Sequence, residues 1–180
     1  MADEFADQVV SVHMAFEEAG IRHAFGGAIA LGYYILAPRA TDDIDINIAV
    51  GKDDAKRVLR ALPAQVKWKM NVIGIAQASG QARVRWLKGT LIDLFFAVSE
   101  YHAVVQSRAE LHVFNGVHTP MVSATDLAIL KATFGRPKDW LDIEQMLRAG
   151  TVDINDSIQW IKIISGVDSE SYRGMFEAIE

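Results

Sequence analysis

The sequence predicts an α+β protein in which a small mixed sheet is flanked by helices and followed by a C-terminal helical region. Two observations support this. Short apolar runs alternate with helix-like segments up to about residue 100, and from Ser123 onward the apolar spacing is helical. We therefore expect an α/β core over residues 1–100 and a mainly helical region, packed on that core, over residues 101–180.

Composition narrows the class of protein. The chain has 180 residues, 51% of them hydrophobic, and a formal net charge of -5, so a surface that coats nucleic acid is not expected. It has no cysteine, which excludes disulfides and thiol chemistry. We see no signal peptide and no apolar stretch of membrane-spanning length, and we expect a cytoplasmic protein without a membrane partner.

The elements of the first half follow from hydrophobic period and from the Gly and Pro residues that end them. They are a helix over 2–19, a strand over 21–25, a helix over 28–36, a strand over 43–50 and a helix over 52–62. Residues 66–78 are ambiguous, and their alternating apolar positions favour a strand.

The second half begins with strands and ends with helices. We expect paired strands over 82–87 and 90–98, a helix over 101–111, and a small hairpin over 112–121 that turns at Asn115 and Gly116. Helices are expected over 125–134, 137–148, 156–165 and 169–179.

The strand DIDINIAV carries the first candidate site residues. Its even positions are apolar, whereas Asp43 and Asp45 share the other face. Their carboxylates can converge on a divalent cation and would otherwise repel each other. A solvated strand face is the simpler interpretation of a lone D-x-D.

Asp93 is the one charge in the strand LIDLFFAV, which is otherwise apolar on both faces. A buried carboxylate needs a partner, which could be Arg83 or Arg85 on the neighbouring strand, or a metal ion. Beside the strand of Asp43 and Asp45, it would complete three carboxylates suited to a two-metal site.

Two further features point to phosphate. Gly26 and Gly27 follow a strand and open a helix, where bare backbone N–H groups can bind an anion, although a plain tight turn explains them too. Lys131 lies on the apolar stripe of its helix, so it either reaches the surface or points toward something negative. Asp139 and Asp142 lie near the start of the next helix, whose dipole already accounts for them.

The five histidines are scattered without ligand-like spacing, and no serine lies in a G-x-S-x-G elbow. Zinc-hydrolase and catalytic-triad interpretations therefore have no support.

The glycine pair, the R-x-T-x-D-I-D segment from Arg39 to Asp45 and the lone Asp93 together resemble the nucleotidyltransferase superfamily typified by DNA polymerase β. With LKATFGRPKDWLDIEQML in the helical half, the chain looks most like its small bacterial branch, which includes abortive-infection, toxin–antitoxin and antibiotic-modifying enzymes. The matching motifs run from Gly26 to about Leu147.

The resemblance implies transfer of NMP from an NTP to an acceptor hydroxyl, with release of pyrophosphate. It implies that Asp43, Asp45 and Asp93 are catalytic and hold two Mg²⁺ ions, with Asp93 as a base. The nucleotide-binding residues that it implies are Gly26, Gly27, Arg39, Thr41, Lys131 and Asp139. The acceptor would be a small molecule, a protein or an RNA end, and an antitoxin would be a further partner.

Two other functions stay open. Ala28 stands where many relatives carry Ser or Thr, which leaves room for a non-catalytic nucleotide- or partner-binding module on the same fold. A D-x-D glycosyltransferase would also use paired aspartates, but the glycine pair and Asp93 favour a nucleotidyltransferase over it.

Overall fold

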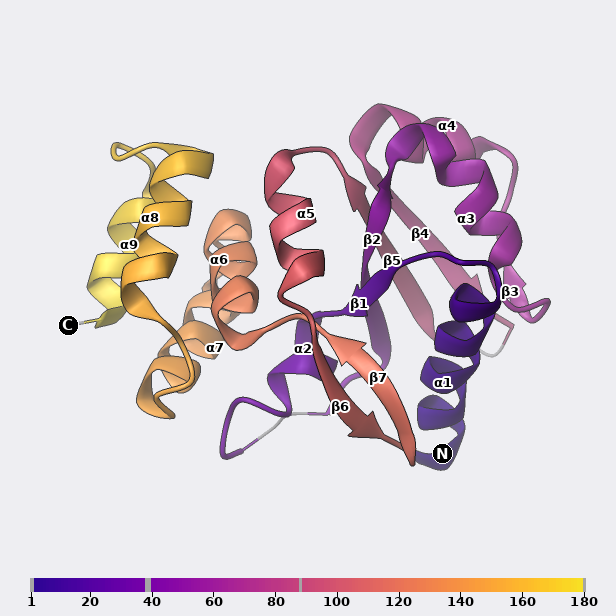
Figure 1. Cartoon of the computed structure of the whole chain (residues 1–180), viewed down its shortest axis with the longest axis horizontal. Coiled ribbons are helices and arrows are strands. Elements are labelled where there is room, and N and C mark those ends of the chain that lie inside the picture. Colours follow the sequence, from indigo (N-terminus) through magenta and orange to yellow (C-terminus); the bar gives the residue numbers. More distant parts are fainter. Residues whose placement is uncertain (1, 38–39, 88, 180) are drawn as a thin grey trace. The chain divides into compact units, whose positions relative to one another are not determined.

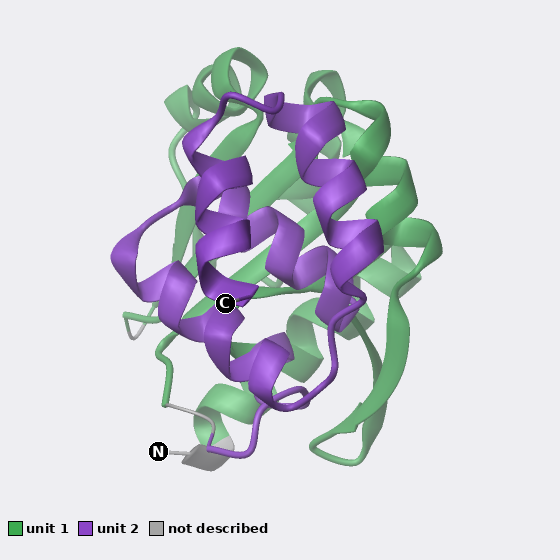
Figure 2. Cartoon of the chain, turned by 90° about the vertical axis from the view of Figure 1, so that its left-hand side faces the viewer, with its two compact units in different colours: residues 1–29, 40–122 green, residues 30–39, 123–180 purple. Residues whose placement is uncertain are grey.

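The segment that carries the two aspartates forms a central strand, β2, of a mixed sheet (Figure 1). The computed structural model describes residues 2–37, 40–87 and 89–179. They divide into two compact units, one of residues 1–29 and 40–122 (unit 1) and one of residues 30–39 and 123–180 (unit 2), coloured separately in Figure 2.

The sheet lies in unit 1 and has seven strands in the order β3-β4-β5-β2-β1-β7-β6. The strands are β1 (His23–Phe25), β2 (Asp43–Gly51), β3 (Val66–Lys67), β4 (Gln81–Trp86), β5 (Leu91–Ala97), β6 (Glu110–Phe114) and β7 (Val117–Met121). β2 runs parallel to β5 and antiparallel to β1, so the predicted mixed sheet is confirmed.

The helices of unit 1 cover and connect these strands (Figure 1). They are α1 (Ala2–Glu18), the start of α2 (Gly27–Leu31), the 3-10 helix η1 (Lys52–Asp54), α3 (Ala55–Ala61), α4 (Asn71–Ser79) and α5 (Glu100–Ser107). Among the described residues, no helix has the length and apolar character needed to cross a membrane.

The core of unit 1 explains why β2 and β5 adopt this register. The side chains of Ile44, Ile46 and Ile48 on β2, and of Ile92, Leu94 and Phe96 on β5, are fully buried. Each contributes about 1.5–3 kcal/mol on transfer from water. Shifting either strand by one residue would turn this set toward the other face, so the apolar positions fix the register.

Unit 2 is helical. Its elements are α6 (Ala124–Phe134), α7 (Pro137–Arg148), α8 (Ile154–Ser165) and α9 (Glu170–Ile179). The Ser123 hydroxyl caps α6 by accepting from the Asp126 N–H, and Gly135 ends it with φ +62°. Pro137 then starts α7, as its fixed φ favours.

Most predicted elements are confirmed, and the hairpin is confirmed in detail. Asn115 and Gly116, between β6 and β7, both have positive φ, of 47° and 79°. This is the backbone of the two-residue turn that Asn-Gly favours.

Two predictions were wrong. Only Val66–Lys67 of the expected strand over 66–78 is a strand, because burial alternates no further and Val72, Ile73 and Ala76 take helical spacing in α4. The helix expected over 28–36 ends at Leu31 and gives way to turns and bends through residue 37. Pro38, its predicted end, lies outside the described residues.

Candidate active site

Asp45 and Asp93 are direct neighbours on parallel strands. The register pairs Asp45 of β2 with Asp93 of β5, and Asp43 with Leu91. Because register partners point to the same side of a sheet, about 4.8 Å apart, the three aspartates share one face. The arrangement on which a joint carboxylate site depends is therefore present in unit 1.

This face is the less buried one. Asp43 is exposed and Asp45 is half-buried, whereas the isoleucines between and beside them are fully buried. Asp93 is half-buried as well, and only alternate residues of β5 are fully buried. The sequence suggested a strand apolar on both faces, but the side of Asp93 is partly open and can admit a ligand.

Arg83 of β4 holds Asp93 with a two-pronged ion pair. Its Nε and terminal guanidinium nitrogen each lie 2.7 Å from one carboxylate oxygen of Asp93. The hydrogen bond to Asp93 is the largest cause that raises the pKa of Arg83 above its usual value, followed by the charge of Asp93, and the charges of Asp43 and Asp45 add to it. Arg83 therefore lies within the field of all three carboxylates.

The glycine pair packs against the same face of β2. Gly26 donates its N–H to the Asp45 carbonyl at 2.8 Å, and a Cβ on Gly26 would lie 3.0 Å from the Asn47 amide nitrogen. Gly27 has φ +53°, and a Cβ there would overlap the Asp45 carboxylate. The glycines are needed because the chain turns directly over Asp45.

The three carboxylates lie on one face but do not form a compact metal site. Among the described residues, Asp43, Asp45 and Asp93 do not form a set of ligand atoms lying within 4.8 Å of one another. Both oxygens of Asp93 are bound by Arg83. Their donor set fits Mg²⁺, which prefers carboxylate oxygens and keeps several waters, but Asp93 would have to exchange Arg83 for the ion.

Thr41 orders the start of β2. Its hydroxyl accepts from the Asp43 N–H at 3.2 Å and lies 3.3 Å from the Asp43 carbonyl, so it is a turn residue in this structure. Arg39, the other residue taken from the R-x-T-x-D-I-D segment, lies outside the described residues.

Lys131 and Asp139 lie in unit 2, in a buried ion-pair group. The Lys131 ammonium is 2.7 Å from Asp142 and 3.6 Å from Asp139, and all three side chains are almost inaccessible to solvent. Burial alone would raise the pKa of Asp139, but hydrogen bonds and charge from Arg136, together with the charge of Lys131, outweigh it and lower that pKa.

Sequence reasoning missed one cluster of metal-binding residue types. His13, Glu17 and His23 offer ligand atoms that all lie within 4.8 Å of one another. The five histidines were expected to be scattered, but His13 and His23 meet across α1 and β1. The available signal was the spacing of His13 and Glu17, which places them one helical turn apart.

Solved structures with similar folds extend over almost the whole chain. The antibiotic-resistance factor ANT(2'')-Ia is 14% identical, has a TM-score of 0.59 and matches over 99% of this chain and 96% of that chain. An antigenic nucleotidyltransferase-like protein from Paracoccidioides brasiliensis is 17% identical, has a TM-score of 0.54 and matches over 97% of this chain and 86% of its own. This chain has the nucleotidyltransferase fold.

The nucleotidyltransferase fold is the fold that the motifs predicted. No family model matches the sequence, and no curated protein matches it. The toxin–antitoxin branch stays a prediction. Within the nucleotidyltransferase fold, β2 and β5 carry the three aspartates and the β1–α2 turn carries the two glycines.

Proposed function

We propose that this protein is a magnesium-dependent nucleotidyltransferase that moves NMP from an NTP to an acceptor hydroxyl. The fold supports nucleotidyl transfer as the kind of function. The observation that carries the proposal is the register of Asp45 with Asp93 on one open face, with the Gly26–Gly27 turn packed over Asp45.

Each residue then has a role. Asp43 and Asp45 would hold the cation, and Asp93 would join them as a third ligand once Arg83 releases it. When bound, Mg²⁺ supplies Lewis-acid stabilisation of the charge on the phosphates and on the acceptor oxygen. Three carboxylates supply enough oxygen ligands for two Mg²⁺ ions.

The reaction forms one P–O bond, breaks another and moves one proton. The acceptor oxygen bonds to the α-phosphorus, the bond from the α-phosphorus to the bridging oxygen breaks, and pyrophosphate leaves with its electron pair. The proton of the acceptor hydroxyl passes to Asp93. Gly26 and Gly27 would let the triphosphate approach their backbone N–H groups, because no side chain stands there.

We also propose that Lys131 and Asp139 contribute to nucleotide binding, together with Arg39 and Thr41. The support for Lys131 is its positive charge, which could attract a phosphate in addition to Asp142 and Asp139. The acceptor would be a small molecule, a protein or an RNA end. An antitoxin partner and a cytoplasmic location remain predictions.

The test is incubation of the purified chain with each α-labelled NTP, Mg²⁺ and a cell extract, followed by fractionation. We expect label to enter one fraction, with EDTA abolishing it. Metal-stimulated NTP binding without label transfer would favour a non-catalytic binding module instead. Better protection against heat by a UDP-sugar than by any NTP would favour a glycosyltransferase.

A further inference from the structure

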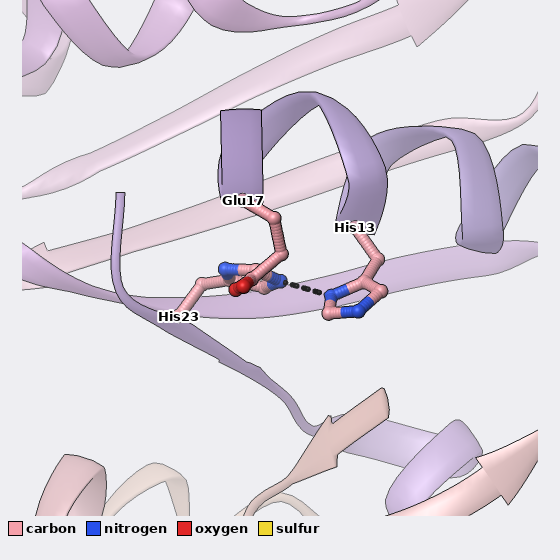
Figure 3. A group of neighbouring side chains, drawn as sticks. All are labelled: His13, Glu17 and His23. Carbon is pink, nitrogen blue, oxygen red and sulfur yellow. Dashed lines mark hydrogen bonds between the residues drawn. The ribbon is translucent and has the colours of Figure 1, made fainter. Parts of the chain in front are cut away.

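A second cluster of ligand-type side chains joins the first helix to the first strand. His13 and Glu17 come from α1 and His23 from β1, and Figure 3 shows the three side chains facing one another. His13 and Glu17 are four residues apart, so they lie on one face of the helix. Both imidazoles are buried, whereas Glu17 is exposed.

The hydrogen bonds of His23 fix which of its nitrogens is bare. Its Nδ1 lies 2.9 Å from the Ile21 carbonyl, which can only accept, so Nδ1 carries the proton. In the neutral ring, Nε2 is therefore an unprotonated lone pair. This lone pair points at Nδ1 of His13, 3.0 Å away. A ring nitrogen whose partner nitrogen donates to a backbone carbonyl is the arrangement of metal-binding histidines.

The His13 ring faces His23 through its Nδ1. The 3.0 Å distance between His13 Nδ1 and His23 Nε2 suits a hydrogen bond when neutral His13 carries its proton on Nδ1. In the other neutral tautomer of His13, both nitrogens present lone pairs, and a cation can then take the place of the proton between them.

The surroundings of the two imidazoles are largely apolar on their buried side. Phe16 and Phe25 pack edge-on against the His23 ring, with ring centres 5.2 and 5.6 Å away. The ligand atoms of His13, Glu17 and His23 nevertheless all lie within 4.8 Å of one another. The cluster therefore brings three ligand-type groups together at the edge of an apolar core.

This cluster lies on the opposite side of the sheet from the aspartates. His23 pairs with Ile48 and Phe25 with Ile46, so His23 shares the fully buried face of β2. Asp45 points to the other face. A cation held by the histidines could not be the one held by Asp43 and Asp45.

We propose that His13, Glu17 and His23 form a binding site for a zinc-type divalent cation that clamps α1 to β1. Two imidazoles and one carboxylate are a common zinc donor set, with water as the fourth ligand. The clamped strand ends at Phe25, directly before Gly26. The cation thus has a structural role and steadies the strand that leads into the glycine turn.

Small movements complete the geometry. Tetrahedral Zn–N bonds of about 2.0–2.1 Å place two ligand nitrogens about 3.3 Å apart, close to the observed 3.0 Å. The Glu17 carboxylate must also move toward the cation. Its exposed and flexible side chain can do so without disturbing the core.

The test is calorimetric titration of the EDTA-treated, dialysed full chain with Zn²⁺ in excess Mg²⁺. We expect one equivalent to bind and the melting temperature to rise. Imidazole ¹⁵N spectra should show His23 Nε2 and His13 Nδ1 shifting on addition of one equivalent, while His23 Nδ1 keeps its proton.

Variants assign the ligands. Glu17→Gln keeps the shape of an exposed side chain, so it should fold normally and weaken zinc binding at least about tenfold, since even the outer partners of metal ligands cost 10–100-fold. Glu18→Gln, its exposed neighbour, is the matched control and should bind as the wild type does. Asp45→Asn should also bind normally, because Asp45 lies on the other face.

Three outcomes would overturn the proposal. Imidazole nitrogens that do not respond to one equivalent of Zn²⁺ would leave a plain hydrogen-bonded histidine pair. Equal affinities of Glu17→Gln and Glu18→Gln would remove Glu17 from the site. Loss of zinc binding in Asp45→Asn would move the site to the aspartates.

Discussion

Two charged groups, one in each unit, differ in burial and in balance. In unit 1, Asp43, Asp45 and Asp93 share an open face with the guanidinium of Arg83, whose side chain is 64% exposed. In unit 2, the buried Lys131 lies between Asp139 and Asp142, and Arg136 adds a second cation.

The difference separates an open face with an excess of carboxylates from a buried ion-pair group whose charges balance. Side-by-side carboxylates on an open face repel one another, so a cation stabilises them and their replacement should not harm the fold. In a buried group whose charges balance, replacement should destabilise the fold, because removing one member leaves its partner charged and desolvated.

The largest effect is expected for Asp45→Asn. Transfer of nucleotide should fall at least about a hundredfold, as when one electrostatic contact to a transition state is lost. The melting temperature without metal should not fall, since a repulsion with Asp93 is relieved. Activity assays and thermal melts check both parts, with Asp42→Asn, the exposed neighbour, as control. A large loss of melting temperature in Asp45→Asn would count against an open binding face.

Lys131→Met should act on stability first. It leaves Asp142 and Asp139 without the buried ammonium, and breaking a buried pair costs about 3–5 kcal/mol. Denaturant unfolding measures the free energy of unfolding. The double variant with Asp142→Leu should recover part of the loss. If Lys131→Met unfolds like the wild type while nucleotide binding is lost, the lysine acts on the ligand alone and the contrast fails.

Gly27→Ala should destabilise the turn and displace the Asp45 carboxylate beneath it. The added Cβ meets the Asp45 carboxylate, and positive φ costs a non-glycine residue about 1–2 kcal/mol. Gly20→Ala is a matched control, because Gly20 also has positive φ (+62°) but has no atom within 4 Å of the added Cβ. Activity should fall in Gly27→Ala only, and equal activity losses in both would show that Asp45 is not displaced.

The smallest effect is expected for Arg83→Gln. Its exposed pair with Asp93 contributes about 1 kcal/mol or less to stability. Freed from Arg83, Asp93 should bind the cation more readily, so half-saturation should need several-fold less Mg²⁺. Arg85→Gln, two residues along the same exposed face of β4, is the control. A Mg²⁺ requirement that rises in Arg83→Gln would mean that the arginine supports the site.

The sequence was most informative where local chemistry decides structure. The alternation of isoleucine with Asp43 and Asp45 predicted the strand and its two faces, because a period of two has no helical equivalent. Asn115 and Gly116 predicted their turn because few other residues adopt positive φ.

Features that depend on tertiary contact were harder to predict. Arg83 and Arg85 were equal candidates for Asp93, and only the strand register chose Arg83. The meeting of His13 with His23 depends on how α1 packs on β1, which no sequence period encodes. For residues 66–78, the alternating pattern was outweighed by helical packing around Ala76.

The most direct measurement compares α-labelled with γ-labelled NTP, using the wild type and Asp45→Asn in parallel with Mg²⁺ and the acceptor fraction. The proposed reaction predicts that the wild type transfers label to the acceptor from the α position only, with one pyrophosphate released per transfer, and that Asp45→Asn transfers none. Label transferred from the γ position, or transfer that survives in Asp45→Asn, would contradict nucleotidyl transfer at this carboxylate face.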